Sequence, residues 1–536
     1  MKKRLIFVLM GIVVVMSSTG CGAARNNVYD DGNAKDSISI YVGTSIFDSS
    51  LDPTKGAMSY GYSFINNALI KVNPQSKYVG DLAEEWTVSD DSLEYTFNLK
   101  KGVKFHDDSD FTAEDVVFTY EKVKNNQGEN ENVDLSKLES VEAMDDYTVK
   151  FTLSEPYSPF LDTVAYLGIV PSDSYDSDEF DEKPIGTGPW KVKQYDTKQQ
   201  IIVEANDNYY DGAPEIKNAN IVNMDSEAAF SNAKSGQLDV VMVGPNYSKE
   251  KVDGMTINNL ETMDVRNISL PCQKPQTVKD SNGNDVKIGN EVTSDKAVRK
   301  ALSIGIDRES IINNALNGVG KKAVGFTDNL AWGGVDDYLD NRKDEAENIL
   351  EEAGWKDTDN DGIREKDNIK CEFNVLAAAN DMQRYLLASA LAEEAEKIGI
   401  KINAKQKSWD EIYNSTYTEP VVWGWGQYNP ILIKQLFYSD EFLKSKTGNV
   451  VAYSNKQADN LIDEAVNTNS QEKAVQKWKE VQMTVNQDYP YLYIVNIEHS
   501  FFISDKLDIS KDTQIPHPHG HGSPIICNMK DWKIKW

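Results

Sequence analysis

Two tryptophans stand two residues apart in the stretch from Val421 to Pro430, "VVWGWGQYNP". On an extended strand Trp423 and Trp425 point to the same face. Gly424 and Gly426 leave the other face bare, which permits a close approach of another backbone. An indole offers a flat apolar surface and one N–H donor, a combination that suits a partly wet pocket. The stretch therefore predicts either a packed core or one wall of a binding site.

Three of the five histidines, His517, His519 and His521, lie within five residues in "IPHPHGHGSP". Imidazoles separated by small residues can bind a transition metal. Alternate side chains of a fully extended chain lie about 6.6 Å apart, which is too far to share an ion. A metal site would need a turn at Gly520, and the alternative is a polar loop near a lobe junction or ligand.

A loop from Asp357 to Asn368, "DTDNDGIREKDN", imitates a calcium-binding loop. Asp357, Asp359, Asp361 and Gly362 fit its positions 1, 3, 5 and 6, but Asn368 stands where the bidentate glutamate is needed. Gly354 also ends the preceding helix, and a strand-like segment follows. We expect a tight acidic turn.

Motifs of hydrolytic enzymes are incomplete. Ser231 and Lys234 match S-x-x-K and Lys446–Gly448 matches K-T-G, but the S-x-N element is missing between them. Ser231 also falls inside a helical pattern rather than at its start. His106 and Asp107 fall in a turn and suit structure better than acid–base chemistry. An exported serine hydrolase acting through Ser231 remains a remote alternative.

The N-terminus has the pattern of an export signal. Lys2, Lys3 and Arg4 precede an apolar run from residue 5 to 16, which is too short for a membrane span. Gly20-Cys21 resembles a bacterial lipobox, although Ser18 stands where leucine is usual. We expect residues 1–20 to be a signal peptide and Cys21 to be lipidated. An ordinary secretory signal is the alternative.

The chain of 536 residues carries a formal net charge of -29 and is too long for one hydrophobic core. Acidity without a basic stripe argues against nucleic-acid binding. Cys272, Cys371 and Cys527 are too few and too far apart to predict a disulfide framework. Polar residues 21–36 predict a flexible tether.

Strands and helices alternate along the body. The pattern predicts a strand in "SISIYVGT", a hairpin from Leu93 to Phe105, and helices over 113–123, 343–354 and 382–399. Alternating strands and helices in the second half predict parallel β-α-β units. The fold class is therefore α/β with several lobes.

An ordered set of segments resembles the family 5 solute-binding proteins, which serve ABC importers of peptides, nickel and related solutes. These segments cover nearly the whole body, and they include Asp81–Val123, Pro184–Asp196 and Ala297–Gly320. The resemblance implies a two-lobed clamp with an extra domain inserted in the first lobe, closing on its ligand about a hinge. It assigns residues 37–75, 185–266 and 496–536 to lobe I, 76–184 to the extra domain, and 267–495 to lobe II.

The resemblance also implies candidate ligand-binding residues. The stretch around Trp423 forms part of the pocket wall in this family, and family members often approach ligand at the place of Thr44 and Ser45. The full set of candidates is Thr44, Ser45, Trp332, Trp423, Trp425, Gln427 and Tyr428. Peptide-binding members often carry an aspartate near the matching tryptophan, where it pairs with the peptide's amino group. This chain has Gln427 instead, and a neutral amide cannot replace that charge.

We therefore expect a monomeric, lipid-anchored extracytoplasmic receptor that is not an enzyme and has no resident cofactor. It would deliver a peptide or similar organic solute to an ABC permease. A nickel or metal-chelate receptor using His517, His519 and His521 is the main alternative.

Overall fold

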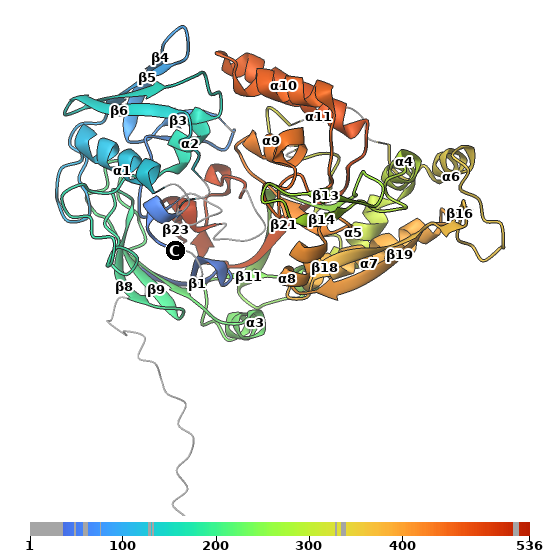
Figure 1. The fold of residues 1–536 in the computed structure, drawn as a ribbon. Helices are drawn as coiled ribbons and strands as arrows, with labels where there is room; N and C mark the ends of the chain where they lie inside the picture. The colour runs from blue at the N-terminus through green and yellow to red at the C-terminus, as the bar shows by residue number, and fades with distance from the viewer. Residues whose placement is uncertain are drawn as a thin grey trace, which may run out of the picture.

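The structure is a computed structural model. It describes residues 36–47, 50–56, 63–75, 77–126, 130, 133–326, 328, 330–333, 339–517 and 525–535. Two lobes lie side by side and are joined by long strands (Figure 1). This is the predicted two-lobed α/β clamp. None of the described helices combines the length and the apolar composition that a membrane span needs.

A nine-stranded sheet runs through the described chain in the order β20-β12-β21-β11-β1-β10-β9-β8, with β15 paired to β21. We call lobe I the part built around β1 and β8–β11, and lobe II the part that contains α4–α11. The predicted first strand is β1, and its apolar residues Ile38 and Ile40 are buried. The lobe I strands are β1 (Ser37–Tyr41), β8 (Trp190–Asp196), β9 (Gln200–Ala205), β10 (Asn218–Val222) and β11 (Val240–Val243).

Two antiparallel hinge strands, β12 (Met255–Ser269) and β21 (Tyr491–Ser504), cross from one lobe to the other. Their register shifts between Glu261 and Val265, where a bulge interrupts the pairing. The Thr262 hydroxyl donates to the carbonyl of Ile497 at 2.7 Å and accepts from the Asp264 backbone N–H at 3.0 Å. A bulge leaves unpaired residues and bends the strand, so we expect the lobes to pivot here.

The extra domain of lobe I contains a four-stranded antiparallel sheet in the order β4-β5-β7-β6. The predicted hairpin from Leu93 to Phe105 is wrong. Only its first half is a strand, β5, and β4 and β7 occupy both edges of β5, so Val103 and Phe105 find no free edge and pack as buried loop residues. The elements are β4 (Ala83–Val88), β5 (Glu94–Leu99), β6 (Leu138–Asp145), β7 (Thr148–Leu153), α1 (Ala113–Asn125) and α2 (Phe160–Tyr166).

Lobe II confirms one predicted parallel β-α-β unit, β18–α7–β19. Gly354 and Gly399 follow α6 and α7 with φ angles of 91° and 81°, as expected of glycines that end helices. The main elements are α4 (Lys296–Gly305), α5 (Arg308–Leu316), α6 (Lys343–Glu352), β18 (Glu372–Ala378), α7 (Met382–Glu396), β19 (Lys401–Lys407), α8 (Trp409–Ser415), β20 (Val422–Trp425), α9 (Ile431–Phe437), α10 (Lys456–Val466) and α11 (Gln471–Asn486).

Short elements complete the described chain. Cys272 and Cys371 form no disulfide within the described part of the chain. The remaining helix and strands are α3 (Ser226–Lys234), β2 (Ile70–Val72), β3 (Tyr78–Gly80), β13 (Gln276–Lys279), β14 (Asp285–Ile288), β15 (Lys321–Lys322), β16 (Glu365–Lys366), β17 (Ile369–Lys370), β22 (Leu507–Asp508) and β23 (Lys533–Ile534). The 3-10 turns are η1 (Ser45–Phe47), η2 (Pro53–Lys55), η3 (Pro245–Tyr247), η4 (Ser439–Glu441), η5 (Lys511–Thr513) and η6 (Ile526–Asp531).

Candidate ligand site between the lobes

Four aromatic rings stack in a row, which we call the aromatic ladder: Tyr413, Trp409, Trp423 and Trp425. The centroids of neighbouring rings lie 5.5 to 5.8 Å apart and their planes are tilted by 24° to 28°. Strand geometry sets Trp423 and Trp425 on one face of β20, and α8 supplies the other two rings. The ladder thus presents a continuous aromatic edge.

The two tryptophans of the ladder differ in exposure. Trp423 is only 3% exposed, and its indole N–H donates to the Ser269 hydroxyl at 3.1 Å, so it is a satisfied core residue in this structure. Trp425 is half-buried, and its indole N–H has no hydrogen-bond partner among the described residues. An inaccessible donor without a partner is unusual in native proteins.

Gln427 and Tyr428 extend from the end of β20 toward lobe I. Both are half-buried. The Tyr428 hydroxyl donates to the carbonyl of Pro516 in lobe I, and the Tyr428 carbonyl accepts from the Trp332 indole at 3.1 Å. Tyr428 therefore joins the lobes, with Trp332 buried behind it.

The two candidates from the first strand lie apart from this wall in lobe I. Thr44 is exposed, and its carbonyl accepts a hydrogen bond from the Phe47 backbone. Ser45 begins the turn η1. The described contacts do not bring these residues to the ladder, and their ligand role stays a prediction.

A glycine is needed at position 424 because an arginine of the neighbouring strand β12 fills the space where a Cβ would lie. Arg266 pairs with Gly424 across β12 and β20, and a Cβ at position 424 would lie 1.7 Å from Arg266 Nη1. The bare face of the W-G-W-G pattern is thus occupied by a guanidinium. Arg266 and Asp264 are both buried, with Nη2 and Oδ2 3.3 Å apart.

The N-terminal end of α7 adds a second charge pair to this place. Arg384 Nε donates to Asp381 Oδ2 at 2.9 Å, and Arg384 Nη1 donates to the Val422 carbonyl at 2.7 Å. Burial alone would raise the pKa of Asp381, but the charges of Arg266 and Arg384 outweigh it and hold that pKa below its usual value. Burial, helped by Arg266, lowers the pKa of Arg384 to about 10. The four formal charges cancel.

On the far side from the hinge, the extra domain touches lobe II at a set of hydrogen bonds that we call the latch. Ser158 donates from its backbone N–H to the Val466 carbonyl at 2.9 Å and from its hydroxyl to the Ala465 carbonyl at 2.8 Å. The Gln471 amide donates back to the Ser158 carbonyl at 2.8 Å. The lobes therefore touch both here and at Tyr428 in this structure.

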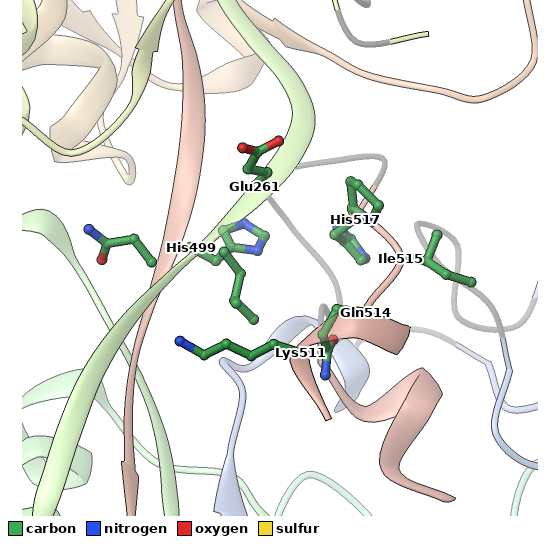
Figure 2. A pocket seen from close by; sticks show the side chains of 9 residues that line it. Glu261, His499, Lys511, Gln514, Ile515 and His517 are labelled. Atoms are coloured by element: carbon green, nitrogen blue, oxygen red, sulfur yellow. The ribbon is translucent and has the colours of Figure 1, made fainter. Parts of the chain in front are cut away.

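A cavity of about 250 Å³ lies beside the hinge strands. Figure 2 shows the His499 and His517 side chains at this hinge cavity, with Lys511 and Gln514 nearby. The imidazole centroids are 5.7 Å apart, and both residues are only 4% exposed. The cavity is lined by Asn259, Leu260, Glu261, His499, Lys511, Gln514, Ile515, Pro516 and His517. None of the predicted aromatic candidates lines it.

The predicted histidine cluster is placed only in part. His517 is described, and its carbonyl accepts from the Met263 backbone at 2.8 Å, which fixes it against the hinge bulge. His519, His521 and Cys21 lie outside the described residues. His499 was missed in the sequence because it sits in an apolar strand far from the cluster.

Two features weighed in the sequence lie away from the clamp's inner wall. Ser231 is exposed in the middle of α3, as its helical pattern predicted. Carboxylates of the acidic turn converge within 4.8 Å of one another, with Glu365 rather than Asn368 as the fourth member. Lys370 pairs with Asp359 and Asp361, so the turn is held by internal ion pairs.

Sequence reasoning missed Ser158 and Arg266 as well as His499. Ser158 stands in an unremarkable loop, and Arg266 interrupts a strand of otherwise neutral pattern. A buried arginine opposite a glycine was the available signal, but the pairing of β12 with β20 is not readable from one strand alone.

Two lobes, paired hinge strands and contacts between the lobes at Tyr428 and Ser158 are the features of a binding protein that encloses a solute. The family described as "Bacterial extracellular solute-binding proteins, family 5 Middle" matches residues 77–441. The chain therefore belongs to family 5 of the bacterial extracellular solute-binding proteins. Members of this family bind solutes for transport and are not enzymes.

Relatives and solved structures agree with this assignment. The oligopeptide-binding protein AppA of Bacillus subtilis is 31% identical over 459 residues, which cover 81% of this chain and 80% of that protein. Its structure in complex with a nonapeptide has a TM-score of 0.69 at 25% identity and covers 94% of this chain and 99% of its own. NikZ from Campylobacter jejuni, solved with Ni(L-His), shares the fold with a TM-score of 0.76 at 24% identity, covering 93% of this chain and 99% of its own.

Proposed function

We propose that this chain is the extracytoplasmic receptor of an ABC importer, and that it captures a peptide or similar organic solute. The solute binds between the lobes, closure removes it from water, and the closed form presents it unchanged to a membrane permease. The observation that carries this is the half-buried Trp425, which ends the aromatic ladder and whose indole N–H has no hydrogen-bond partner among the residues that the structure describes. Such a ring offers stacking surface and a donor to an enclosed guest.

Similarity to an oligopeptide-binding relative supports a peptide-like solute. The wall around β20 offers no carboxylate at Gln427, so a peptide's amino group must find its counter-charge elsewhere. On the neighbouring strand β12, the buried Asp264 directly precedes Val265, which is the register partner of Trp425. It is the carboxylate of β12 that is closest in sequence to this pair. A neutral or blocked amino terminus is equally compatible with Gln427.

Solute capture is tested by native mass spectrometry of the purified body, followed by small-angle scattering with and without short peptides. We expect a co-purifying solute of unchanged mass and a more compact profile when it is bound. A body whose profile is insensitive to every peptide and cell extract, or a solute released in altered form, would contradict the receptor function.

Membrane attachment through Cys21 is a separate proposal. A lipidated cysteine followed by the polar tether 21–36 would hold the acidic body near its permease. Changing Cys21→Ser should move the protein from the membrane fraction to the medium or the soluble extracytoplasmic fraction. Retention in the membrane fraction would refute lipid anchoring.

A metal chelate is the second candidate solute, because His499 and His517 lie together at the hinge cavity. Imidazoles in this arrangement can take part in coordinating Ni²⁺ supplied with a small chelator. Native mass spectrometry with Ni²⁺ and free histidine tests this. A nickel adduct that survives the paired change His499→Ala and His517→Ala would remove these residues from the candidate site.

A further inference from the structure

Residues 514–517, which we call the strap, leave lobe I and reach both the hinge bulge and lobe II. Two neighbouring carbonyls of the strap accept hydrogen bonds from different parts of the molecule. The Pro516 carbonyl accepts from the Tyr428 hydroxyl of lobe II. The His517 carbonyl accepts from the Met263 backbone N–H of the hinge bulge at 2.8 Å. One short segment therefore contacts lobe II and the hinge strand at the same time.

The strap is anchored in lobe I by a buried asparagine. Gln514 Nε2 donates to Asn528 Oδ1 at 2.7 Å and to the Ile509 carbonyl at 3.0 Å. Asn528 also accepts from the Trp532 indole at 3.1 Å and donates to the Thr513 hydroxyl at 2.9 Å. The first residue of the strap is therefore fixed to the C-terminal turn η6.

At the hinge, the strap supplies an acceptor that the ladder with β21 does not supply there. The ladder between β12 and β21 is interrupted between Glu261 and Val265, and Met263 lies inside this gap. The strap pairs with β12 in parallel at this point, through His517 and Thr262. Met263 is only 2% exposed, so its backbone N–H would lose its acceptor in a place that water hardly reaches if the strap moved away. The conformation of the bulge therefore depends on the strap.

The lobe II end of the strap is held by a well-supported side chain. Burial raises the pKa of the Tyr428 phenol, which keeps the hydroxyl protonated and able to donate. The Tyr428 carbonyl accepts from the Trp332 indole at 3.1 Å, and the Trp332 carbonyl accepts from the Gln482 amide of α11 at 2.8 Å. Trp332 and Gln482 are both buried. A displacement of lobe II therefore carries Tyr428 with it, and it either breaks the bond to Pro516 or pulls the strap.

A cavity separates part of the strap from the hinge strands. The hinge cavity of about 250 Å³ is lined by all four residues of the strap and by residues 259–261 and His499 of the hinge strands (Figure 2). A segment that borders a cavity lacks close packing on that side. The position of the strap therefore depends mainly on the hydrogen bonds at its two ends.

We propose that the strap couples the position of lobe II to the conformation of the hinge bulge. While Tyr428 holds Pro516, the next carbonyl stays on Met263 and the bulge keeps its shape. When Tyr428 leaves, the strap is released and the bulge is free to pivot. An element with two arrangements, biased from both of its ends, is the physical basis of such coupling. The coupling needs no solute, so it also operates in the protein without one.

Hydrogen exchange at the Met263 amide measures the coupling, because this amide is bonded to the strap and not to Tyr428. Exchange is followed in the purified protein after exhaustive dialysis, by mass spectrometry with fragmentation that resolves single amides. Tyr428→Phe removes only the phenolic hydroxyl and should raise the exchange rate at Met263 about fivefold or more. The control Tyr417→Phe removes a phenolic hydroxyl that donates to the Ser445 carbonyl at 2.8 Å within lobe II, and it should change that rate by less than about twofold.

Gln514→Ala tests the other end of the strap. The change removes contacts within lobe I only, and Asn528 keeps the Trp532 indole as a donor. It should also raise exchange at Met263. Because either change alone releases the strap, the double variant with Tyr428→Phe should exceed the larger single effect by less than about twofold.

The ladder amides of β12 in residues 255–261 are the internal reference, and they should keep their exchange rates. Exchange at Met263 that does not respond to Tyr428→Phe or to Gln514→Ala would overturn the coupling. So would single effects that multiply in the double variant, since the two ends would then act independently. An equal rise at the reference amides, or in Tyr417→Phe, would overturn it as well, because the cause would be a general loss of stability.

Discussion

The backbone N–H of Ser158 in the extra domain donates to the carbonyl of Val466 in lobe II across 2.9 Å. Val466 is the last residue of α10, and the last carbonyls of a helix lack partners within the helix. Ser158 supplies two such partners, one from its backbone and one from its hydroxyl. The extra domain thus caps a helix of the opposite lobe in this structure, and we expect this contact to favour closure of the clamp.

Ser158→Ala should loosen the closed state. The change removes the hydroxyl donor to the buried Ala465 carbonyl, at a cost of about 1 kcal/mol. Because bound solute depends on the closed state, dissociation constants of all solutes should rise by about fivefold together. Stopped-flow tryptophan fluorescence and calorimetry measure this. Ser154→Ala, which touches only the extra domain, is the control, and a solute-dependent change at Ser158 would contradict a latch.

Trp425→Ala and Trp423→Ala should separate binding from stability. Trp423 is a packed core residue, so its truncation should lower the free energy of unfolding by about 3–5 kcal/mol. Trp425 is half-buried with an unpaired N–H, so its truncation should mainly weaken solute binding, by about tenfold or more. Urea unfolding and solute titration on both variants check this. Equal stability losses with unchanged affinity for Trp425→Ala would place that ring in the core.

Local sequence patterns predicted several elements of the fold correctly. Alternation predicted β1, the strand-like segment after the acidic turn is β18, and glycines at 354 and 399 ended α6 and α7 as expected. The hairpin prediction after Leu93 failed because strand pairing is decided by which edges remain free, and that depends on β7, some fifty residues later along the chain. Long-range pairing is not written in local alternation.

The sequence predicted the candidate site only where a single segment shows a recognisable pattern. The W-G-W-G stretch showed its two faces, and the aromatic face does form a ladder. The reason for Gly424 lies on another strand, since Arg266 reaches it from β12. The contacts of Ser158 and His499 depend on distant partners: Ser158 binds the α10 terminus 307 residues later, and His499 lies beside His517, which is 18 residues later.

Gly424→Ala should therefore disturb Arg266. The new Cβ would lie 1.7 Å from Nη1 and 2.8 Å from Cζ, so the guanidinium has to move. We expect a loss of about 1–3 kcal/mol in unfolding free energy, measured by urea denaturation. In the Asp264→Asn, Arg266→Gln background the same change should cost less, because a glutamine ends before the crowded position. Equal costs in both backgrounds would mean that the guanidinium does not occupy this place.

His106 should make the protein sensitive to mild acid. Its Nε2 faces the Gly188 carbonyl at 3.0 Å, and its Nδ1 accepts the Gly186 backbone N–H at 3.2 Å, so the neutral ring is the form that fits. Burial is the main cause that lowers the pKa of His106 to about 4, and nearby Lys191 adds to it. Protonation would turn Nδ1 from an acceptor into a donor, and it would then face the Gly186 N–H, which is also a donor.

The pH window follows from that pKa. Unfolded chains bind the proton with a pKa of about 6.5, whereas the folded protein resists it down to about 4. The contribution of His106 to stability is therefore complete above pH 6.5, falls as the pH drops toward 4, and amounts to about 3 kcal/mol over that range. Urea unfolding at several pH values, compared with His106→Gln, isolates this residue because all other titrating groups are shared. Stability curves of wild type and variant that stay parallel from neutral to acid pH would show that His106 accepts its proton as readily folded as unfolded.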